Sequence, residues 1–326
     1  MTFKNSLALC AIITALSPIA AQAKEVLTLY TSQPNKDAQQ TVDAFEKANP
    51  DIEVKWVRDG TTKLMTKLRA ELASGVVKPD VLLIADTVTM ESMVADKHLL
   101  AYNSPMRTQY DASLYHNEGY YYGTKLITSG IVRHKKATHS PTSWAQLTNS
   151  KYSGQLVMPS PLYSGAALIH LATLTNEPTL GWPYYQKLHD NGAMAQGGNG
   201  GVLKAVTSGS KSYGVIVDFL AIREAAKGSP IEFIFPTEGV SMVTEPVAIM
   251  AKSTHQESAK KFVDFVLSQD GQQLVLEQGY LPARADMGVP KGFPSRDKIK
   301  LMTFDAQATL EANDANKQRF SNIFGG

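Results

Sequence analysis

Cysteine is almost absent from this sequence, because Cys10 is the only one among 326 residues. It follows Leu9, so it lacks the small preceding residue that a lipoprotein cleavage site would show. A single thiol forms no internal disulfide, and the rest of the chain has no thiolate for a metal site or a nucleophile. A chain of about 300 residues buries enough apolar surface to fold without disulfides, and it is long enough for two domains.

Blocks of one charge are also absent. The chain has 32 lysines and arginines and 30 acidic residues, a formal net charge of +2. It contains no basic cluster of the kind that binds nucleic acid or membrane surfaces. We therefore expect neither partner, and we expect a monomer.

Long hydrophobic runs are lacking except near the N-terminus. There, Lys4 precedes the apolar run LALCAIITALSPIA and the A-x-A site Ala21-Gln22-Ala23. This order is typical of a secretory signal peptide, and the run is shorter than the ~20 residues of a membrane-spanning helix. We predict a signal peptide over residues 1–23, cleaved after Ala23, and a periplasmic protein. A buried N-terminal helix is the alternative, but it would not need the A-Q-A sequence.

Motifs of catalysis are missing as well. The sequence has no H-E-x-x-H, G-x-S-x-G or P-loop motif. Gly198-Asn199-Gly200 resembles the beginning of a dinucleotide fingerprint, but Leu203 stands where the third glycine is required. The seven histidines are scattered along the chain. We therefore predict no enzyme activity, no metal site and no cofactor.

Strand-like and helix-like segments alternate in the first part of the chain. Strands are predicted at 26–31, 52–57 and 80–86, with helices at 36–48 and 61–73 between them. The continuous apolar run within 80–86 is typical of a strand that is buried on both faces. This alternation predicts an α/β fold with a parallel sheet between layers of helices.

A second α/β series follows the extended stretch 119–132. Its predicted elements are strands at 155–160 and 213–218, and helices after Gly165, at 179–188, after the glycine-rich turn 197–201 and at 219–228. A further extended stretch, 231–251, precedes one amphipathic helix, Ala259–Gly279. Two α/β domains joined by two extended crossovers form a hinged cleft, and small ligands bind in such clefts.

Small polar residues follow the predicted strands at the points where helices begin. The carboxyl ends of parallel strands form the ligand crevice of an open sheet, and helix N-termini there bind anions through free N–H groups. Gly165 begins its helix without a bulky or charged side chain, which lets an anion approach the backbone. Capping explains any one such helix start, but several starts on one cleft favour a binding site. The candidate residues for the anion are Ser32, Gln33, Gly60, Thr61, Thr62, Thr87, Ser160, Tyr163, Ser164 and Gly165.

Three acids, Asp86, Asp218 and Glu245, lie at strand ends or crossovers. A carboxylate there can accept hydrogen bonds from solute hydroxyls or pair with an ammonium group, and a capping or salt-bridge role is equally open. Two tyrosine clusters, Tyr120–Tyr122 and Tyr184–Tyr185, could bind ferric iron through phenolates. Packing is the favoured interpretation of both clusters.

Several segments are distinctive: VLTLYTSQP, WVRDGTTKLMTKLRAELASG, PDVLLIAD, GTKLITSGIVRHKK, PTSWAQL, EPVAIMAKSTHQESAKKFVDFVLSQDGQQLV and QGYLPAR. Together they resemble periplasmic solute-binding proteins of ABC importers, in the branch with ferric-ion, hexose-phosphate, phosphonate and thiamine binders. The resemblance implies a type II α/β fold, with two lobes, a two-strand hinge and a central cleft. It also implies a cognate ABC permease with its ATPase as partner. We expect 24–125 and 237–290 in lobe 1, and 126–236 and 291–326 in lobe 2.

The resemblance also bears on the solute. Ferric binders of this branch carry adjacent tyrosines near the positions where this sequence has Val217, Asp218 and Phe219. The stretch VDFLAIREAAKGSPIEFIFPTEG is more similar to the organophosphate and phosphonate binders. We therefore predict capture of a small anionic organophosphate or phosphonate, such as aminoethylphosphonate or a sugar phosphate. The alternatives are a ferric-iron binder that uses Tyr120–Tyr122, and a secreted hydrolase with Asp86 and Asp218 as a carboxylate pair.

Overall fold

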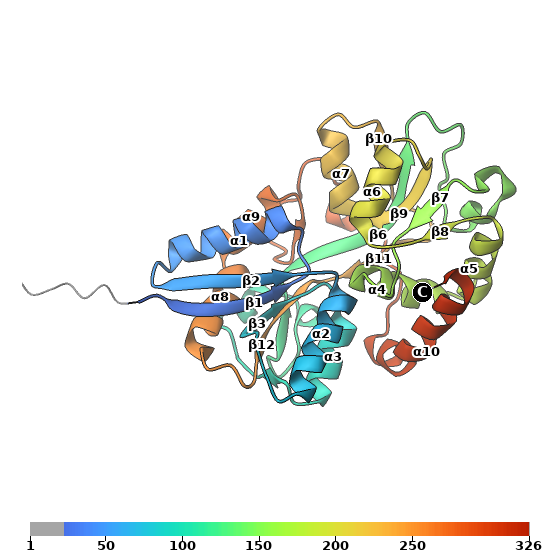
Figure 1. Cartoon of the computed structure of the whole chain (residues 1–326). Helices are drawn as coiled ribbons and strands as arrows, with labels where there is room; N and C mark the ends of the chain where they lie inside the picture. Colours follow the sequence, from blue (N-terminus) through green and yellow to red (C-terminus); the bar gives the residue numbers. More distant parts are fainter. Residues whose placement is uncertain (1–22, 326) are drawn as a thin grey trace, which may run out of the picture.

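The computed structural model describes residues 23–325. The predicted signal peptide over 1–23 therefore lies outside the described residues, apart from Ala23, and so does Cys10. Two β-sheets, each with helices packed on both faces, form two lobes (Figure 1). Among the described residues, no helix combines the length and the apolar character needed to cross a membrane.

Lobe 1 contains a sheet in the order β2-β1-β3-β12-β4, with β5 also paired to β12. β1 is parallel to β2 and β3, whereas β12 is antiparallel to its neighbours. The strands are β1 (Glu25–Thr31), β2 (Ile52–Arg58), β3 (Val81–Leu83), β4 (Leu99–Leu100), β5 (Tyr121–Gly123) and β12 (Pro246–Met250). All three residues of β3 are buried, as its apolar run predicts for a strand covered on both faces.

The helices of lobe 1 are α1 (Asn35–Ala48), α2 (Thr61–Ala73), α3 (Thr87–Ala95), α8 (Gln256–Leu267) and α9 (Gln269–Glu277). Phe45 of α1 and Phe262 of α8 pack on one face of the sheet with Leu27 and Leu29. On the other face, Leu64 and Leu68 of α2 and Met90 and Met93 of α3 pack with Tyr30 and Leu82. The sheet is therefore covered on both sides.

The single helix predicted over Ala259–Gly279 is wrong, because Ser268 divides it into α8 and α9. The backbone of Ser268 is extended (φ −67°, ψ 169°), and its hydroxyl accepts a hydrogen bond from Gly271 N at 3.1 Å. A serine side chain can bond to nearby backbone N–H groups, which favours a helix start over a helix interior. Ser268 is therefore the N-cap of α9. The apolar periodicity continues across the break, which explains why the pattern alone does not reveal it.

Lobe 2 contains a sheet in the order β10-β6-β9-β7-β8, with β11 and β13 also paired to β6. Its strands are β6 (Lys125–His134), β7 (Leu156–Met158), β8 (Met194–Ala195), β9 (Tyr213–Val217), β10 (Ile231–Ile234), β11 (Ser241–Val243) and β13 (Leu281–Pro282). Its helices are α4 (Gly165–Thr175), α5 (Gly181–Asp190), α6 (Asn199–Thr207), α7 (Asp218–Ala226) and α10 (Ala306–Phe324). Short 3-10 helices lie at Pro105–Gln109, Ala112–Leu114, Ala145–Thr148, Ser150–Tyr152 and Arg296–Lys298.

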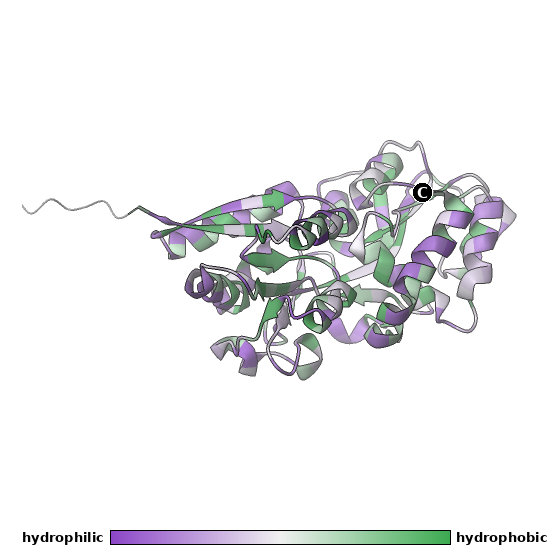
Figure 2. Ribbon diagram, turned by 60° about the horizontal axis from the view of Figure 1, so that its bottom comes forward, coloured by the Kyte–Doolittle hydropathy of each residue, from purple (hydrophilic) through white to green (hydrophobic). Residues whose placement is uncertain are grey.

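The hydropathy of the chain follows this layering. Figure 2 shows hydrophobic residues concentrated on the strands and hydrophilic residues on the outer surfaces of helices such as α10. In lobe 2, successive residues of β9 face opposite cores: Val215 packs with α4 and α5, and Ile216 packs with α6 and α7. This alternation is the period of a strand covered by helices on both faces.

The chain passes between the lobes at Thr124, at Thr244–Glu245 and again between α9 and β13. The first two passages lie side by side, since Thr124 N donates to the Thr244 carbonyl at 3.0 Å, and they form the hinge. The predicted division differs from the observed pairing at β11 and β13. Both fall within 237–290, assigned to lobe 1 from the sequence, yet both pair with β6. The reason is the length of β6, whose ten residues take β13, β11 and β10 in turn as partners. α10 also packs on both lobes, against α5 and against α3.

A buried ion pair joins the two passages. Lys125 Nζ lies 2.7 Å from Glu245 Oε2, and the side chains are 1% and 3% exposed. Lys125 also lies over the ring of Tyr280, 4.1 Å from its centroid, and Gln33 Nε2 donates to Glu245 Oε2 at 3.3 Å. Glu245 has a φ of 40°, a conformation that is uncommon for residues other than glycine. The buried ion pair and this uncommon backbone conformation therefore occur at the same hinge residue.

We predict that Lys125→Met lowers the free energy of unfolding by about 3–5 kcal/mol, because it leaves the Glu245 carboxylate buried without its counter-charge. Urea denaturation followed by circular dichroism measures the loss. The double variant Lys125→Met/Glu245→Gln should recover at least half of it, since no buried charge remains. Lys135→Met, at an exposed position just after β6, is the matched control. Equal losses in Lys125→Met and the control would contradict a stabilising role for the pair.

Candidate functional site

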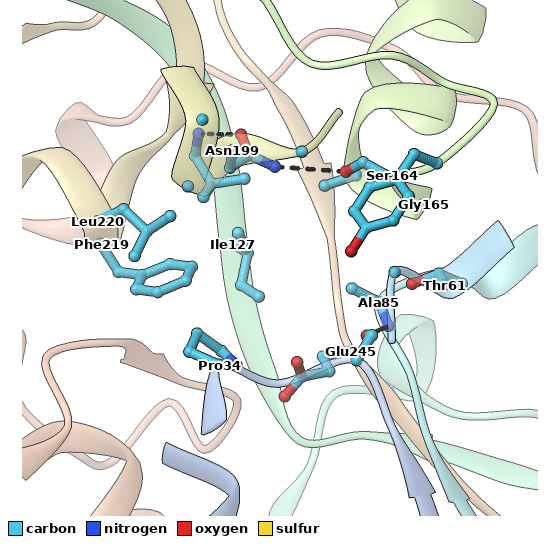
Figure 3. Close-up of a pocket in the computed structure, with 18 of the residues that line it drawn as sticks. Pro34, Thr61, Ala85, Ile127, Ser164, Gly165, Asn199, Phe219, Leu220 and Glu245 are labelled. Carbon is cyan, nitrogen blue, oxygen red and sulfur yellow. Dashed lines mark hydrogen bonds between the residues drawn. The ribbon is translucent and has the colours of Figure 1, made fainter. Parts of the chain in front are cut away.

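A cavity of about 300 Å³ lies between the lobes, at the carboxyl ends of the strands. Its walls come from both lobes, as Figure 3 shows for Pro34, Thr61 and Ala85 of lobe 1 and for Ile127, Ser164 and Phe219 of lobe 2. The place agrees with the general rule that open α/β sheets bind ligands at this edge. The cavity is therefore the candidate site.

Five helices begin at the wall of this cavity. Their N-cap residues, which all line it, are Pro34 of α1, Gly60 of α2, Ser164 of α4, Gly198 of α6 and Val217 of α7. Four of these caps make no side-chain capping bond; Ser164 alone does, by accepting from Ala167 N at 3.3 Å. Proline, glycine and valine have no side-chain acceptor, so N–H groups of the first turns remain available to a ligand. The exceptions are Thr62 N, which donates to the Tyr163 carbonyl at 3.3 Å, and Phe219 N, which donates to Asp218 Oδ1 at 2.6 Å.

Asn199 ties three of these helix starts together. Its Nδ2 donates to Ser164 Oγ at 3.3 Å, and its Oδ1 accepts from Val217 N at 3.1 Å, as the dashed lines of Figure 3 mark. The side chain thus links α4, α6 and α7 within lobe 2. This residue was not among the sequence-predicted candidates, because the segment GGNGG has the composition of a turn. The signal was present: Gly200 and Gly201 leave the start of α6 as bare as Gly165 leaves the start of α4.

The charges at the cavity are few. Among the described residues that line it, Arg58 is the one cationic side chain and Glu245 the one acid. Arg58 Nε donates to the Gln33 carbonyl at 2.8 Å, which holds the guanidinium beside the start of α1. Burial raises the pKa of Glu245, while Lys125 beside it acts in the opposite direction. Arg58 is a second residue that was not among the sequence-predicted candidates, although it ends a strand two residues before Gly60.

Seven of the residues predicted for the site line the cavity: Ser32, Gly60, Thr61, Tyr163, Ser164, Gly165 and Glu245. Six do not: Gln33, Thr62, Asp86, Thr87, Ser160 and Asp218. Gln33 is buried and donates to Glu245, and Ser160 Oγ accepts from Leu162 N in its own turn. The structure therefore brings the small helix-starting residues together and directs most of the others elsewhere.

The two aspartates have structural partners. Asp86 caps α3, accepting from Thr89 N at 3.1 Å and from the Thr89 hydroxyl. Asp218 accepts from Thr128 N at 2.9 Å and from Thr128 Oγ1 at 2.7 Å. Both carboxylates are 1% exposed. Their predicted contact with a solute does not fit this geometry, because their oxygens are directed at the protein's own donors.

The tyrosine clusters also lie away from the cavity. Tyr121 donates to Glu91, Tyr122 OH donates to the Tyr102 carbonyl at 2.6 Å, and neither lines the cavity. Tyr184 and Tyr185 are buried in the core of lobe 2, as the packing interpretation predicts. Tyr163 is therefore the one phenol at the wall among the described residues.

The lobes touch beside the cavity. Thr62 N donates to the Tyr163 carbonyl at 3.3 Å, and Thr62 Oγ1 donates to the Pro161 carbonyl at 3.2 Å. Gly165 packs so closely on lobe 1 that a Cβ there would lie 2.2 Å from the Ala85 carbonyl oxygen. Gly60 is equally constrained, since a Cβ would lie 2.6 Å from the ring of Tyr163. Absence of side chains at both glycines is what allows this closed arrangement.

A profile of the family described as "Bacterial extracellular solute-binding protein" matches residues 77–309. The chain belongs to this family. The predicted recognition of a solute-binding protein is confirmed, and membership implies a small-molecule solute, a cognate permease and a periplasmic location. Proteins of this family bind solutes and are generally not enzymes.

The comparisons also confirm the predicted type II fold. The chain is similar to AfuA from Actinobacillus pleuropneumoniae, solved with fructose 6-phosphate, with a TM-score of 0.84, 20% identity and coverage of 93% and 99% of the two chains. It is similar to iron-bound HitA from Pseudomonas aeruginosa, with a TM-score of 0.80, 20% identity and coverage of 92% and 99%. A Salmonella typhimurium relative named "Putative 2-aminoethylphosphonate-binding periplasmic protein" is 23% identical over 84% of each chain.

The buried carboxyl of Asp218 generates a prediction about pH. Burial raises its pKa to about 7, against the opposing effect of the hydrogen bonds from Thr128 and Phe219. An exposed aspartate has a pKa of about 4, so between these values the folded chain binds more protons than the unfolded chain. As pH rises from 4 to 7, wild type should therefore lose stability relative to Asp218→Asn, by at most about 1.4 kcal/mol per pH unit.

Urea denaturation of both chains at pH 4.5, 5.5 and 6.5 measures this difference. The buried His170, whose pKa is lowered to about 3 by burial, titrates with the opposite effect on stability. It is present in both chains, so its effect cancels in the difference. A difference in unfolding free energy that stays constant with pH would show that Asp218 is ionised throughout.

Proposed function

We propose that this chain captures a small solute with a phosphate or phosphonate group in the periplasm and delivers it to the permease of an ABC importer. The observation that carries the proposal is the convergence of five helix N-termini on one cavity. Each terminus carries a partial positive charge of roughly half a unit and presents free N–H donors. Together they favour a ligand with several negatively charged oxygens.

Arg58 supports an anionic solute further. Its guanidinium adds a full charge at the cavity wall, and its fork of donors matches the oxygens of phosphate and phosphonate groups. Nε is bound to the Gln33 carbonyl. The two terminal nitrogens have no hydrogen-bond or ion-pair partner among the described residues, so they remain available to the solute.

Ferric iron is the alternative solute for this fold. An iron site of the predicted kind needs phenolates or carboxylates, and the cavity has Tyr163 alone as phenol and Glu245 alone as acid among the described residues. Glu245 is already paired with Lys125. The described residues also contain no group of three His, Cys, Asp or Glu side chains that could hold a metal ion. The lining therefore favours an anion over a cation.

The relatives support an organic anion without deciding which one. Proteins of this same fold have been solved with fructose 6-phosphate and with iron, so the fold does not select the solute. The name of the Salmonella typhimurium relative refers to a phosphonate. That name agrees with the proposal drawn from the cavity, but an identity of 23% is too low to assign the same solute to this chain. A hydrolase is disfavoured, because Asp86 and Asp218 do not line the cavity.

Closure of the lobes would commit the solute to the cavity. The anion would contact α1 and α2 from lobe 1 and α4, α6 and α7 from lobe 2. A solute with contacts to both lobes binds the closed form more tightly than the open form, and that difference in affinity shifts the population toward closure. The closed arrangement would then be what the permease recognises.

A panel of solutes tests the proposal by thermal shift and titration calorimetry. The panel contains inorganic phosphate, methylphosphonate, 2-aminoethylphosphonate, fructose 6-phosphate, ferric citrate, and glucose as a neutral control. We expect the melting temperature to rise with at least one phosphate or phosphonate, since a ligand at 100 times its Kd stabilises the folded chain by about 2.7 kcal/mol. Binding of iron with a visible tyrosinate absorption band, and of none of the phosphorus compounds, would overturn the proposal.

Arg58→Gln is the matching variant for the best solute of that panel. It should weaken binding about tenfold or more, because a hydrogen bond to a charged group contributes about 1.5–3 kcal/mol. Lys55→Gln removes the same charge from an exposed position of the same strand, and it should change the affinity less than twofold. If both variants weaken binding equally, the attraction is a general charge effect and Arg58 does not contact the anion.

Gly165→Ala should prevent full closure. The new Cβ would meet the Ala85 carbonyl at 2.2 Å, a backbone contact that no side-chain rotation relieves. We expect the radius of gyration, measured by small-angle X-ray scattering with saturating solute, to stay larger than that of wild type. We also expect at least tenfold weaker binding. Gly288→Ala, where a Cβ would meet nothing within 4 Å, is the control. A Gly165→Ala protein that compacts like wild type would contradict the closed arrangement described above.

A further inference from the structure

We propose that the solute carries an apolar body, an aromatic ring or a compact hydrocarbon group, attached to its anionic group. This inference rests on the proposed function and names the chemical class of its solute. The cavity has two unlike sides. In Figure 3, Pro34, Ile127, Phe219 and Leu220 gather on one side, and Thr61, Ser164 and Gly165 lie on the other.

The apolar wall is the surface formed by Pro34, Ile127, Phe219 and Leu220. Its four residues come from three elements: the N-cap of α1, the strand β6 and the first turn of α7. None of these side chains has a hydrogen-bond donor or acceptor. A solute group in contact with them gains by leaving water only if it is itself apolar.

The apolar wall is also rigid. The centroid of the Phe219 ring lies 4.1 Å from the centroid of the Tyr280 ring. The guanidinium of Arg223 lies 4.7 Å from the centroid of the Phe219 ring. Phe219 is 4% exposed, so the packing behind it prevents the ring from turning away. Arg223 is in turn bound to Asp37, with both Nη1–Oδ distances at 3.0 Å. A wall fixed in this way is preformed for one shape of solute.

The apolar wall offers no hydrogen bonds to replace those that a polar solute body would lose with water. Glu245 is the one side-chain carboxylate at the cavity among the described residues, and Lys125 and Gln33 both engage its Oε2. Hydroxyl or ammonium groups of a solute that face Phe219 and Leu220 would lose water without new partners, because neither side chain has a hydrogen-bond donor or acceptor. A ring or a hydrocarbon group has no such loss.

Three phosphonates with one shared head group test this inference by titration calorimetry on the purified protein. They are methylphosphonate, 2-aminoethylphosphonate and benzylphosphonate. We expect benzylphosphonate to bind at least tenfold more tightly than each of the other two. The heat capacity change of its binding should be more negative than that of methylphosphonate, because that quantity reports burial of apolar surface.

Two leucine variants assign the selectivity to the apolar wall. Leu220 is half-buried at the wall, and Leu220→Asn should reduce the ratio of benzylphosphonate to methylphosphonate affinity at least fivefold. Leu203, also half-buried but on α6 and outside the cavity lining, is the matched control. Leu203→Asn should keep the wild-type ratio. Melting temperatures of both variants verify that they fold.

The outcomes separate this inference from the proposed function. If methylphosphonate or 2-aminoethylphosphonate binds as tightly as benzylphosphonate, an apolar body is wrong while the phosphonate site stands. The apolar body is also wrong if Leu203→Asn and Leu220→Asn change the ratio equally. If no phosphonate and no other anion of the panel binds, the proposed function is wrong and this inference with it.

Discussion

The arrangement at the cleft depends on helix N–H groups that receive no side-chain cap from the chain itself. Four of the five helices that begin there start with proline, glycine or valine, which have no side-chain acceptor to offer. Unpaired N–H groups are costly when buried, so their convergence creates a place where an anion binds favourably. Asn199 holds three of these helix starts in register by bonding to Ser164 and Val217.

The fold brings these groups together because of how parallel strands connect. Each strand that leads into a helix delivers the helix N-terminus to the carboxyl edge of its sheet. The two sheets meet at those edges across the hinge, where Lys125 and Glu245 form their buried ion pair. That pair lies at the hinge, and Glu245 also lines the wall of the cavity.

Local patterns point to several of the helix-starting residues that line the cavity. Gly60, Thr61, Ser164 and Gly165 lie at the cavity because a strand end followed by small residues is a short-range signal. Asp86 and Asp218 lie at equivalent strand ends, but they accept hydrogen bonds from Thr89 and Thr128. Thr89 is three residues from Asp86, whereas Thr128 is 90 residues from Asp218, so only tertiary structure identifies the second partner.

The sequence by itself determined the α/β fold, the order of most elements and the class of the protein, because apolar periodicity and helix-start chemistry act over a few residues. The predictions omitted the helices α3 and α10. Tertiary structure decided the rest. It placed β11 and β13 on β6, enclosed Glu245 with Lys125, and set Phe219 and Leu220 opposite Ser164. These contacts join residues far apart in the chain, and packing between whole elements determines which of them form.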